Sequence, residues 1–349
     1  MPDDTEFPDF DHARLRHHGD VDARPGMVDF AVNVQGSAPP DWLRERLAGR
    51  LGELGRYPGE ADERAARAAV AARHGRAVDE VLLLAGVAEG FAMLPRLGSR
   101  LAAVIHPSFT EPELALREAG VPVARVMLAP PYALESAVAP ADADLVVVGN
   151  PTNPTSVLHP ADSIRALRRP GRVVVVDEAF ADAVPGEPES LAGESHPDVL
   201  VFRSLTKTWA LAGLRCGYVL GAPPVLARLN HGRPHWPLGT LQLEAIAAAS
   251  EPAAVAEAQR RAETIAVDRA AMIPRLRELG IEVHEPAHGP FLLLRVPDAE
   301  LLRKKLADKG IAVRRGDTFP GLETGFLRVA VRPAAEVDRL VAAIRDVGL

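Results

Sequence analysis

From residue 81 onward, short runs of aliphatic residues alternate with stretches of helical pattern. The runs are VLLLAG, LAAVIHP, DLVVVGN, RVVVVDE, VLVFRS and CGYVLG. Continuous apolar strands that are separated by helices favour a parallel sheet covered on both faces. The sequence therefore predicts an α/β core. In such sheets, ligands bind at the carboxyl ends of the strands, so functional residues are expected directly after each run.

After about residue 230 the pattern changes to a long helical region rich in Ala, Arg and Glu. Four short strands follow, IEVHEP, FLLLRV, IAVRRG and FLRVAV, with helices expected near residues 299–308 and 335–346. This pattern predicts a small α+β domain beside the large one. We expect the large domain to span residues 36–230 and the small domain to combine residues 1–35 and 231–349. The cleft between the two domains is the expected site.

Composition excludes several classes of function. The formal net charge is −7 and the basic residues form no stripe, which argues against a nucleic-acid partner. No apolar run approaches the roughly 20 residues of a membrane helix, and the acidic opening MPDDTEFPDFDH is unlike a signal peptide. A single cysteine, Cys216, fits a reducing compartment. We therefore expect a cytoplasmic protein that does not act on nucleic acid or at a membrane, and we predict no metal site.

The residues that follow the strands are polar and, taken together, describe a receptor for a planar, phosphorylated, cationic heterocycle. Asp177, after four valines, would keep a ring nitrogen protonated. Asn153, in the turn NPTNPT, would donate to a phenolic oxygen, and Phe109 would stack on the ring. Each residue alone also fits a simpler interpretation: a capping Asp, a Pro-Asn turn and a core Phe.

A phosphate group requires backbone amides at the start of a helix, and AGVAEGFAML offers a Gly turn followed by a helical pattern. The amides are predicted to come from Gly86, Val87 and Ala88. On the other side, the guanidinium of Arg215 and the hydroxyls of Ser204 and Thr206 would complete the phosphate site. Lys207 would then attach covalently to an aldehyde of the heterocycle, although an isolated lysine is more often a solvated charge.

The motifs NPTNPT, VVVVDEAFAD and SLTKTWALAGLRCGY occur in an order and spacing that resemble the fold-type I pyridoxal phosphate enzymes of the aminotransferase class I/II group. The resemblance covers nearly the whole chain. It implies pyridoxal 5'-phosphate (PLP) as cofactor and an aspartate aminotransferase-like fold with a mostly parallel seven-stranded sheet in the large, PLP-binding domain. It also implies a homodimer in which Tyr57, in GRYPGE, reaches the partner's cofactor phosphate.

Within this group the chain is most similar to threonine-phosphate decarboxylases of cobalamin biosynthesis and to histidinol-phosphate aminotransferases. The opening HHGDVDARPGMVDFAVNVQGSAPP and the strand FLRVAVR carry this similarity. It implies that His18 and Asn33 face the substrate, that Arg328 holds an α-carboxylate and that Arg332 is a candidate for the substrate phosphate. The chain departs from the family pattern at five positions: Gln35, Gly36, Ala88, Ser156 and Pro290. The missing side-chain hydrogen bond at Ala88 predicts a weaker hold on the cofactor.

The resemblance implies an enzyme that acts on a small phosphorylated amino acid or amine. Whichever Cα bond lies perpendicular to the cofactor ring is the one that breaks, so the same residues serve transamination and decarboxylation. Decarboxylation of L-threonine O-3-phosphate is narrowly preferred, with histidinol-phosphate amino transfer as the alternative. A non-catalytic PLP-binding protein is a third possibility. A nicotinamide dehydrogenase is excluded because no G-x-G-x-x-G follows the first strand.

Overall fold

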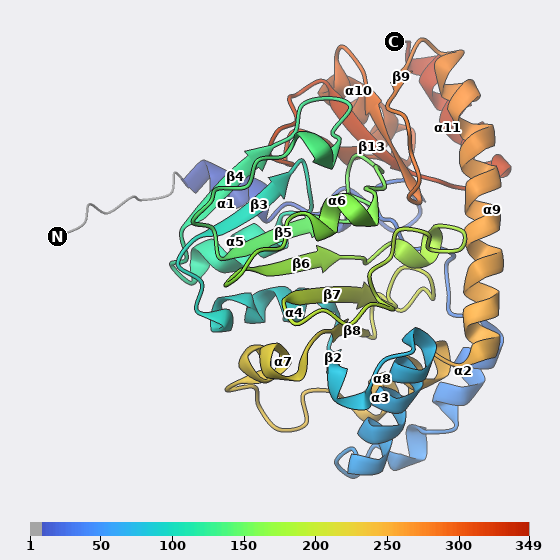
Figure 1. The fold of residues 1–349 in the computed structure, drawn as a ribbon. Helices are drawn as coiled ribbons and strands as arrows, with labels where there is room; N and C mark the ends of the chain where they lie inside the picture. The colour runs from blue at the N-terminus through green and yellow to red at the C-terminus, as the bar shows by residue number, and fades with distance from the viewer. Residues whose placement is uncertain (1–8, 349) are drawn as a thin grey trace.

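The computed structural model describes residues 9–348 of the chain, so residues 1–8 of the predicted small domain lie outside it. A seven-stranded sheet occupies its centre, in the order β2-β8-β7-β6-β5-β3-β4 (Figure 1). Its strands are β2 (Val81–Leu84), β3 (Ala102–His106), β4 (Val123–Met127), β5 (Leu145–Gly149), β6 (Val173–Asp177), β7 (Val199–Ser204) and β8 (Gly217–Leu220). Neighbouring strands are parallel except where β8 pairs with β2 and β7. The predicted mostly parallel seven-stranded sheet is confirmed.

Alternate side chains of each strand enter two different cores, because successive residues of a strand point to opposite faces. In β5, for example, Val146 and Val148 lie in one core and Val147 in the other. The first core is covered by α2 (Asp41–Ala48), α3 (Glu60–His74), α6 (Ala161–Arg165) and α8 (Thr240–Ala249). The second is covered by α4 (Val87–Met93), α5 (Glu111–Glu118) and α7 (Pro223–Asn230). The sheet is thus covered on both faces, as the apolar runs predicted.

A smaller antiparallel sheet has the strand order β12-β13-β10-β9. Its strands are β9 (Glu282–Val283), β10 (Phe291–Arg295), β12 (Arg314–Arg315) and β13 (Phe326–Ala330). It shares a core with α10 (Ala299–Asp308) and α11 (Ala334–Val347), and a short parallel pair joins β1 (Val28–Asp29) to β11 (Ile311–Ala312). The predicted strands and helices of this region are all present. The N-terminal segment contributes α1 (Asp9–Leu15).

Helix α9 (Pro252–Arg277) connects the two cores. Its 26 residues give a length of about 39 Å at 1.5 Å per residue, and in Figure 1 it runs along one side of the molecule from α2 and α8 to α11. Ala254 and Ala258 pack in the core of the large sheet, whereas Met272 and Leu276 pack in that of the small sheet. The domain boundaries that we drew from the sequence stay a prediction.

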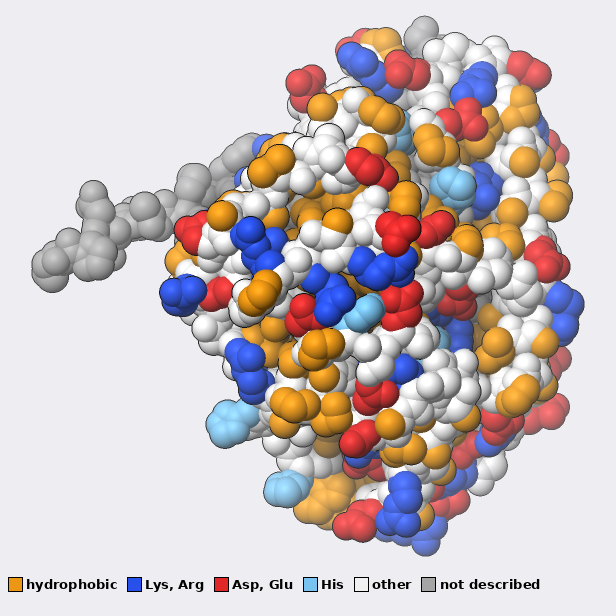
Figure 2. All heavy atoms as spheres, viewed as in Figure 1, with side chains coloured by type: hydrophobic (Ala, Val, Ile, Leu, Met, Phe, Trp, Pro, Cys, Tyr) orange, Lys and Arg blue, Asp and Glu red, His pale blue; other side chains and the backbone are white. Residues whose placement is uncertain are grey.

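Short 3-10 turns complete the fold at η1 (Gly19–Val21), η2 (Leu51–Glu53), η3 (Val78–Glu80), η4 (Leu94–Leu97), η5 (Leu134–Ser136) and η6 (Ala181–Ala183). Within residues 9–348, no helix has both the length and the apolar character needed to cross a membrane. On the face shown in Figure 2, acidic and basic side chains are interspersed rather than gathered into a field of one sign.

Candidate active site

A cavity of about 510 Å³ lies at the carboxyl ends of the parallel strands, between the large sheet, the N-terminal segment and the small sheet. Twelve of the residues selected from the sequence line this cavity. They are His18, Asn33, Val87, Ala88, Phe109, Asn153, Asp177, Ser204, Thr206, Lys207, Arg215 and Arg328. They come together because the carboxyl ends of parallel strands share one edge of the sheet.

Lys207 follows β7 and points into the cavity without an acidic partner. Among residues 9–348, no hydrogen bond or ion pair reaches its Nζ. Burial, together with the nearby guanidinium groups of Arg328 and Arg215, lowers the pKa of Lys207 to about 8. Much more of this amine is therefore neutral near physiological pH than of a solvated lysine, and the neutral amine is the form that reacts with an aldehyde. The Lys207 carbonyl accepts a hydrogen bond from the Gln35 amide at 2.9 Å, which ties the lysine loop to the N-terminal segment.

Asp177 ends β6 at the base of the cavity. Within the described chain, the one hydrogen bond to its carboxylate comes from the Ala179 amide at 3.1 Å. Burial raises the pKa of Asp177 to about 7, against a smaller lowering effect of Lys207. A carboxylate held here without a hydrogen-bonded cation suits a ligand that brings its own positive charge, such as a protonated ring nitrogen.

A second part of the cavity suits a phosphate group. The Ser204 and Thr206 hydroxyl oxygens lie 2.6 Å apart, and the exposed Arg215 lies beside Gly86. Gly86 is required for two reasons: its φ of +81° favours glycine, and a Cβ atom added there would lie 2.7 Å from Arg215 Nη2. Gly86 precedes α4, and amides in the first turn of a helix have no intrahelical acceptor. These hydroxyls, amides and guanidinium fit the phosphate of PLP.

Between these two parts lie Phe109 and Asn153. The Phe109 ring faces the cavity with its centroid 5.4 Å from that of His18. Asn153 Oδ1 accepts a hydrogen bond from Arg328 Nη1 at 2.8 Å, so the amide nitrogen of Asn153 is the atom left to donate to a ligand. Together with Asp177 and Lys207, the donor set matches the groups of PLP from ring nitrogen to phosphate, so the residues present fit this cofactor.

Arg328 on β13 lies buried beside a second arginine, Arg314 on β12, that the sequence reasoning missed. The two residues are Cα partners across the antiparallel pair. Burial and the other guanidinium lower the pKa of Arg328 to about 9, and burial lowers that of Arg314 to about 10. Arg314 Nη1 and Arg328 Nε have no hydrogen-bond partner in the described part of the chain. Arg314 could be found only from the pairing of β12 with β13, because these two strands are separated by a loop in the sequence and their register is set by the fold.

The N-terminal segment closes the cavity from the other side. His18 Nε2 lies 2.5 Å from Glu111 Oε1, so this imidazole is already engaged by a carboxylate. Asn33 is buried, and its Oδ1 has no partner among residues 9–348.

Ser156, which replaces the usual glycine, adopts φ +65° and its Oγ accepts a hydrogen bond from the Gly289 amide at 2.8 Å. This departure from the family pattern thus has its own structural use.

Three selected residues are not among those that line this cavity: Gly86, which lies beside Arg215 at the phosphate part, and Arg332 and Tyr57. The Arg332 guanidinium donates to the carbonyl oxygens of Asp29, Val32 and Val34 at 2.9, 2.6 and 3.0 Å. The prediction that Arg332 meets the substrate phosphate does not fit this placement, because its donors already hold the segment that carries Asn33. Tyr57 is 73% exposed and stacks on Trp236 with 4.3 Å between ring centroids.

Comparison with known proteins identifies the family of the chain. The sequence model of the family described as aminotransferase class I and II matches residues 25–344. A histidinol-phosphate aminotransferase of Mycobacterium tuberculosis is 59% identical over 96% of this chain and 91% of its own length. A threonine-phosphate decarboxylase of Salmonella typhimurium is 30% identical over 92% of this chain and 91% of its own.

Solved structures with the same fold include a histidinol-phosphate aminotransferase from Clostridium acetobutylicum. Its TM-score is 0.82 at 22% identity, with 91% of this chain and 98% of that chain covered. The L-threonine-O-3-phosphate decarboxylase from Porphyromonas gingivalis has a TM-score of 0.82 at 22% identity, with 92% of this chain and 99% of that chain covered. The predicted resemblance, fold class and cofactor are confirmed. The chain belongs to the class I and II aminotransferase family and has the fold-type I architecture of the solved structures above. It is a PLP-dependent enzyme.

Proposed function

We propose that this enzyme transfers the amino group of a small phosphorylated amine, and that histidinol phosphate is its amino donor. The 59% identity to a histidinol-phosphate aminotransferase supports this choice over the decarboxylase, whose relative is 30% identical. The narrow preference for decarboxylation that the sequence suggested is therefore replaced by its alternative.

The observation that carries the proposal is the opposed pair Arg314 and Arg328. Like charges directly opposite each other on antiparallel strands repel, and burial makes the repulsion stronger. Both guanidinium groups line the cavity, and Arg314 Nη1 and Arg328 Nε each lack a hydrogen-bond partner in the described chain. The one ion pair of Arg314 there is a long one, 3.8 Å from its Nη1 to Asp22 Oδ2. A dianionic phosphate would satisfy both at once, since guanidinium groups match phosphate oxygens. The substrate should therefore carry a phosphate at a fixed distance from its amine.

The chain's own residues divide the work of catalysis. Bound PLP supplies an electron sink that weakens bonds at the amine-bearing carbon of the substrate. Lys207 would hold the cofactor through its aldehyde carbon and, once released, its Nζ would carry the proton removed from that carbon. Asp177 would keep the ring nitrogen charged, while Ser204, Thr206 and Arg215 would anchor the cofactor phosphate.

The test is an assay of the purified enzyme with histidinol phosphate and 2-oxoglutarate, scored for glutamate. We expect amino transfer with histidinol phosphate and, because Arg314 and Arg328 would lose the phosphate that balances their charge, at least about 100-fold lower kcat/KM with histidinol. Arg314→Ala should reduce this difference between the two donors. Equal kcat/KM for both donors would contradict the proposal.

Decarboxylation of threonine phosphate is the second candidate, because two arginines could also bind a carboxylate and a phosphate separately. Histidinol phosphate has no carboxylate on its amine-bearing carbon and cannot be decarboxylated, so the two activities are separable. Release of carbon dioxide from threonine phosphate, without amino transfer from histidinol phosphate, would favour this candidate.

We also propose that the enzyme is a homodimer in which Tyr57 completes the partner's site. Tyr57 and Trp236 form an exposed aromatic stack, and Leu51 and Leu54 in the same part of the chain are also more than half exposed. Exposed aromatic and aliphatic side chains of this kind are typical of an interface. Light scattering that shows an active monomer would contradict this assembly. The cytoplasmic location stays a prediction.

A further inference from the structure

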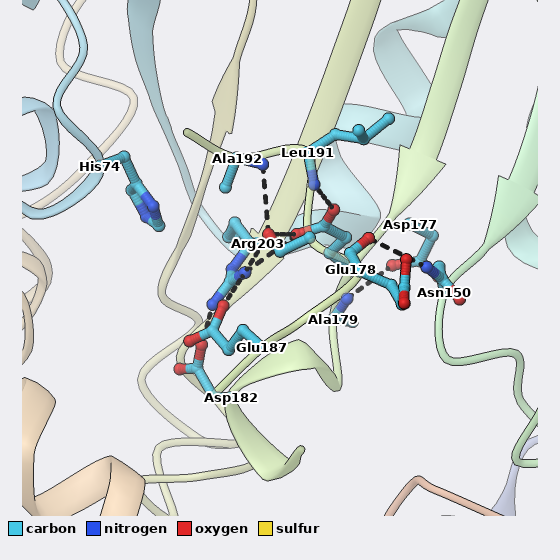
Figure 3. A network of polar contacts seen from close by, with 12 residues as sticks. His74, Asn150, Asp177, Glu178, Ala179, Asp182, Glu187, Leu191, Ala192 and Arg203 are labelled. Carbon is cyan, nitrogen blue, oxygen red and sulfur yellow. Dashed lines mark hydrogen bonds and ion pairs between the residues drawn. The ribbon is translucent and has the colours of Figure 1, made fainter. Parts of the chain in front are cut away.

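A network of charged side chains lies behind the candidate active site, on the opposite face of the large sheet (Figure 3). Two pairs of consecutive residues connect the faces. Asp177 and Ser204 line the cavity, whereas their neighbours Glu178 and Arg203 point to the other side, because successive strand residues alternate. The register of β6 and β7 pairs Asp177 with Phe202, so Glu178 and Arg203 follow as the next facing positions.

Glu178 has a partner for each of its carboxylate oxygens. Oε2 accepts hydrogen bonds from Arg203 Nη1 at 2.9 Å and from Ser190 Oγ at 2.6 Å, and Oε1 accepts one from the Leu191 amide at 2.7 Å. The side chains of Glu178 and Arg203 are 0% and 1% exposed. This pair is therefore held in one geometry by charge, by hydrogen bonds and by the exclusion of water.

Arg203 continues the network away from β6. Its guanidinium pairs with Asp182 and with Glu187, and Asp182 in turn accepts a hydrogen bond from Arg73 Nη2 at 2.9 Å. The segment from Glu178 to Leu191 is thus fixed to β7 and to α3 at several points. Ala179 and Phe180, which belong to this segment, form part of the cavity wall.

The same segment is tied to the end of β5. The Asn150 amide donates to the Asp177 carbonyl oxygen at 2.8 Å, and Asn150 Nδ2 donates to the carbonyl oxygen of Glu189 at 3.3 Å. Asn153 comes three residues later in the chain. The ends of β5, β6 and β7, which carry Asn153, Asp177 and Ser204, are therefore cross-linked from the side that faces away from the cofactor.

We propose that Glu178 and Arg203 are positioning residues for PLP. Their ion pair sets the distance between the end of β6, where Asp177 would hold the ring nitrogen, and the end of β7, where Ser204 and Thr206 would hold the phosphate. The pyridine ring of PLP is rigid and its phosphate is joined to the ring by a short linker, so both ends can be bound well only over a narrow range of this distance. The inference rests on the roles proposed for Asp177 and Ser204 and is independent of which amine is the substrate.

The chain offers a matched control in a second buried ion pair. Arg76 Nη2 lies 2.9 Å from Glu80 Oε1, and these side chains are 3% and 12% exposed. Glu80 directly precedes β2 and so lies at the amino end of that strand, away from the cavity. Glu80→Gln should therefore lower the melting temperature of the holoenzyme without altering its hold on PLP.

The experiment compares Glu178→Gln with Glu80→Gln in the holoenzyme. The readouts are the dissociation constant of PLP, the pH midpoint of its visible absorption band, the melting temperature, and kcat and KM with the amino donor. For Glu178→Gln we expect about tenfold weaker PLP binding, a displaced pH midpoint and about tenfold lower kcat, with the donor KM changed by less than about twofold. PLP affinity and the absorption band are measured without substrate, so a wrong amino donor would leave these readouts intact.

Ser190→Ala decides the matter if Glu178→Gln does not fold, because it removes one hydrogen bond to Glu178 and leaves the ion pair with Arg203. It should weaken PLP binding about two- to threefold and displace the pH midpoint in the same direction. The proposal is overturned if the folded variants differ from wild type only in melting temperature, as Glu80→Gln does, with PLP affinity and the absorption band unchanged.

Discussion

At the carboxyl ends of the strands, the two faces of the large sheet differ in whether their buried charged side chains have partners of opposite charge. On the face away from the cavity, Arg203 lies among three carboxylates, and its pKa is raised well above the usual arginine range mainly by Glu187 and Asp182, against the effect of burial. On the cavity face, burial moves each group toward its neutral form: the pKa of Asp177 rises to about 7 and that of Lys207 falls to about 8. Buried charge that the chain leaves uncompensated marks the position of a charged ligand.

Glu178 is the instructive exception on the paired face. Burial raises its pKa even though Arg203, Ser190 and the Leu191 amide all stabilise the charged form. Desolvation of a carboxylate is large enough to compete with several hydrogen bonds. Asp177, with one backbone donor, has far less compensation, which explains why it needs a ligand's positive charge.

The largest expected effect comes from removing the cavity amine. Lys207→Ala should reduce turnover by more than about 10⁴-fold, because both covalent attachment and proton transfer are lost. Borohydride reduction of the wild-type holoenzyme should fix PLP on Lys207, as peptide mapping would show. Lys309→Ala, in which an exposed lysine paired with Asp346 is removed, serves as the control and should leave turnover unchanged. An adduct mapped to a different lysine would be incompatible with this site.

The second prediction concerns stability in the absence of cofactor. The folded-state pKa of Asp177 is raised from 3.8 to about 7, so the folded protein binds this proton more tightly than the unfolded chain does. Its contribution is therefore complete below about pH 4 and is lost as the pH rises through 7. The contribution of Asp177 to the free energy of unfolding is on the order of 4 kcal/mol at most, because each unit of pKa shift corresponds to about 1.4 kcal/mol.

Urea unfolding of cofactor-free wild type and Asp177→Asn at several pH values checks this. The difference in unfolding free energy between the two proteins should fall from pH 4 to pH 8, because asparagine does not titrate. Addition of PLP should restore the stability of the wild type at pH 8. A difference that is constant across this range would show that Asp177 has an ordinary pKa.

The third prediction is kinetic. Asp177→Asn should lower turnover at least about 100-fold in a folded protein, because a neutral amide cannot keep the ring nitrogen protonated. Circular dichroism would verify the fold, and steady-state kinetics would measure the loss. Near-normal turnover would remove Asp177 from the catalytic group and would weaken the contrast between the two faces.

Much of the cavity face could be predicted from the sequence because it depends on local order. Asp177, Lys207 and Phe109 each follow an apolar run, and parallel strands bring such positions to one edge. Arg314 could not be found this way, since its place opposite Arg328 depends on the register of two antiparallel strands. The resemblance suggested Arg332 as a ligand, yet its guanidinium holds carbonyl groups of the N-terminal segment. Strand β4 was not marked among the runs, because its side chains are mostly half-buried at the sheet edge.

The last prediction concerns Tyr57, which is largely exposed and lies on neither face of the large sheet of its own chain. If a second copy of the chain brings this hydroxyl to the cofactor phosphate, the partner supplies a hydrogen bond to the phosphate that residues of one chain alone do not make. Tyr57→Phe should then weaken PLP binding by about 1.5–3 kcal/mol, the contribution of one hydrogen bond to a charged group, without changing the fold. Trp236 stacks on the Tyr57 ring, and the phenylalanine ring would keep this contact. Equilibrium dialysis of PLP measures the effect, and light scattering establishes that the variant remains dimeric. An unchanged PLP affinity in a dimeric Tyr57→Phe variant would mean that the cavity is completed by the cofactor and by residues of one chain alone.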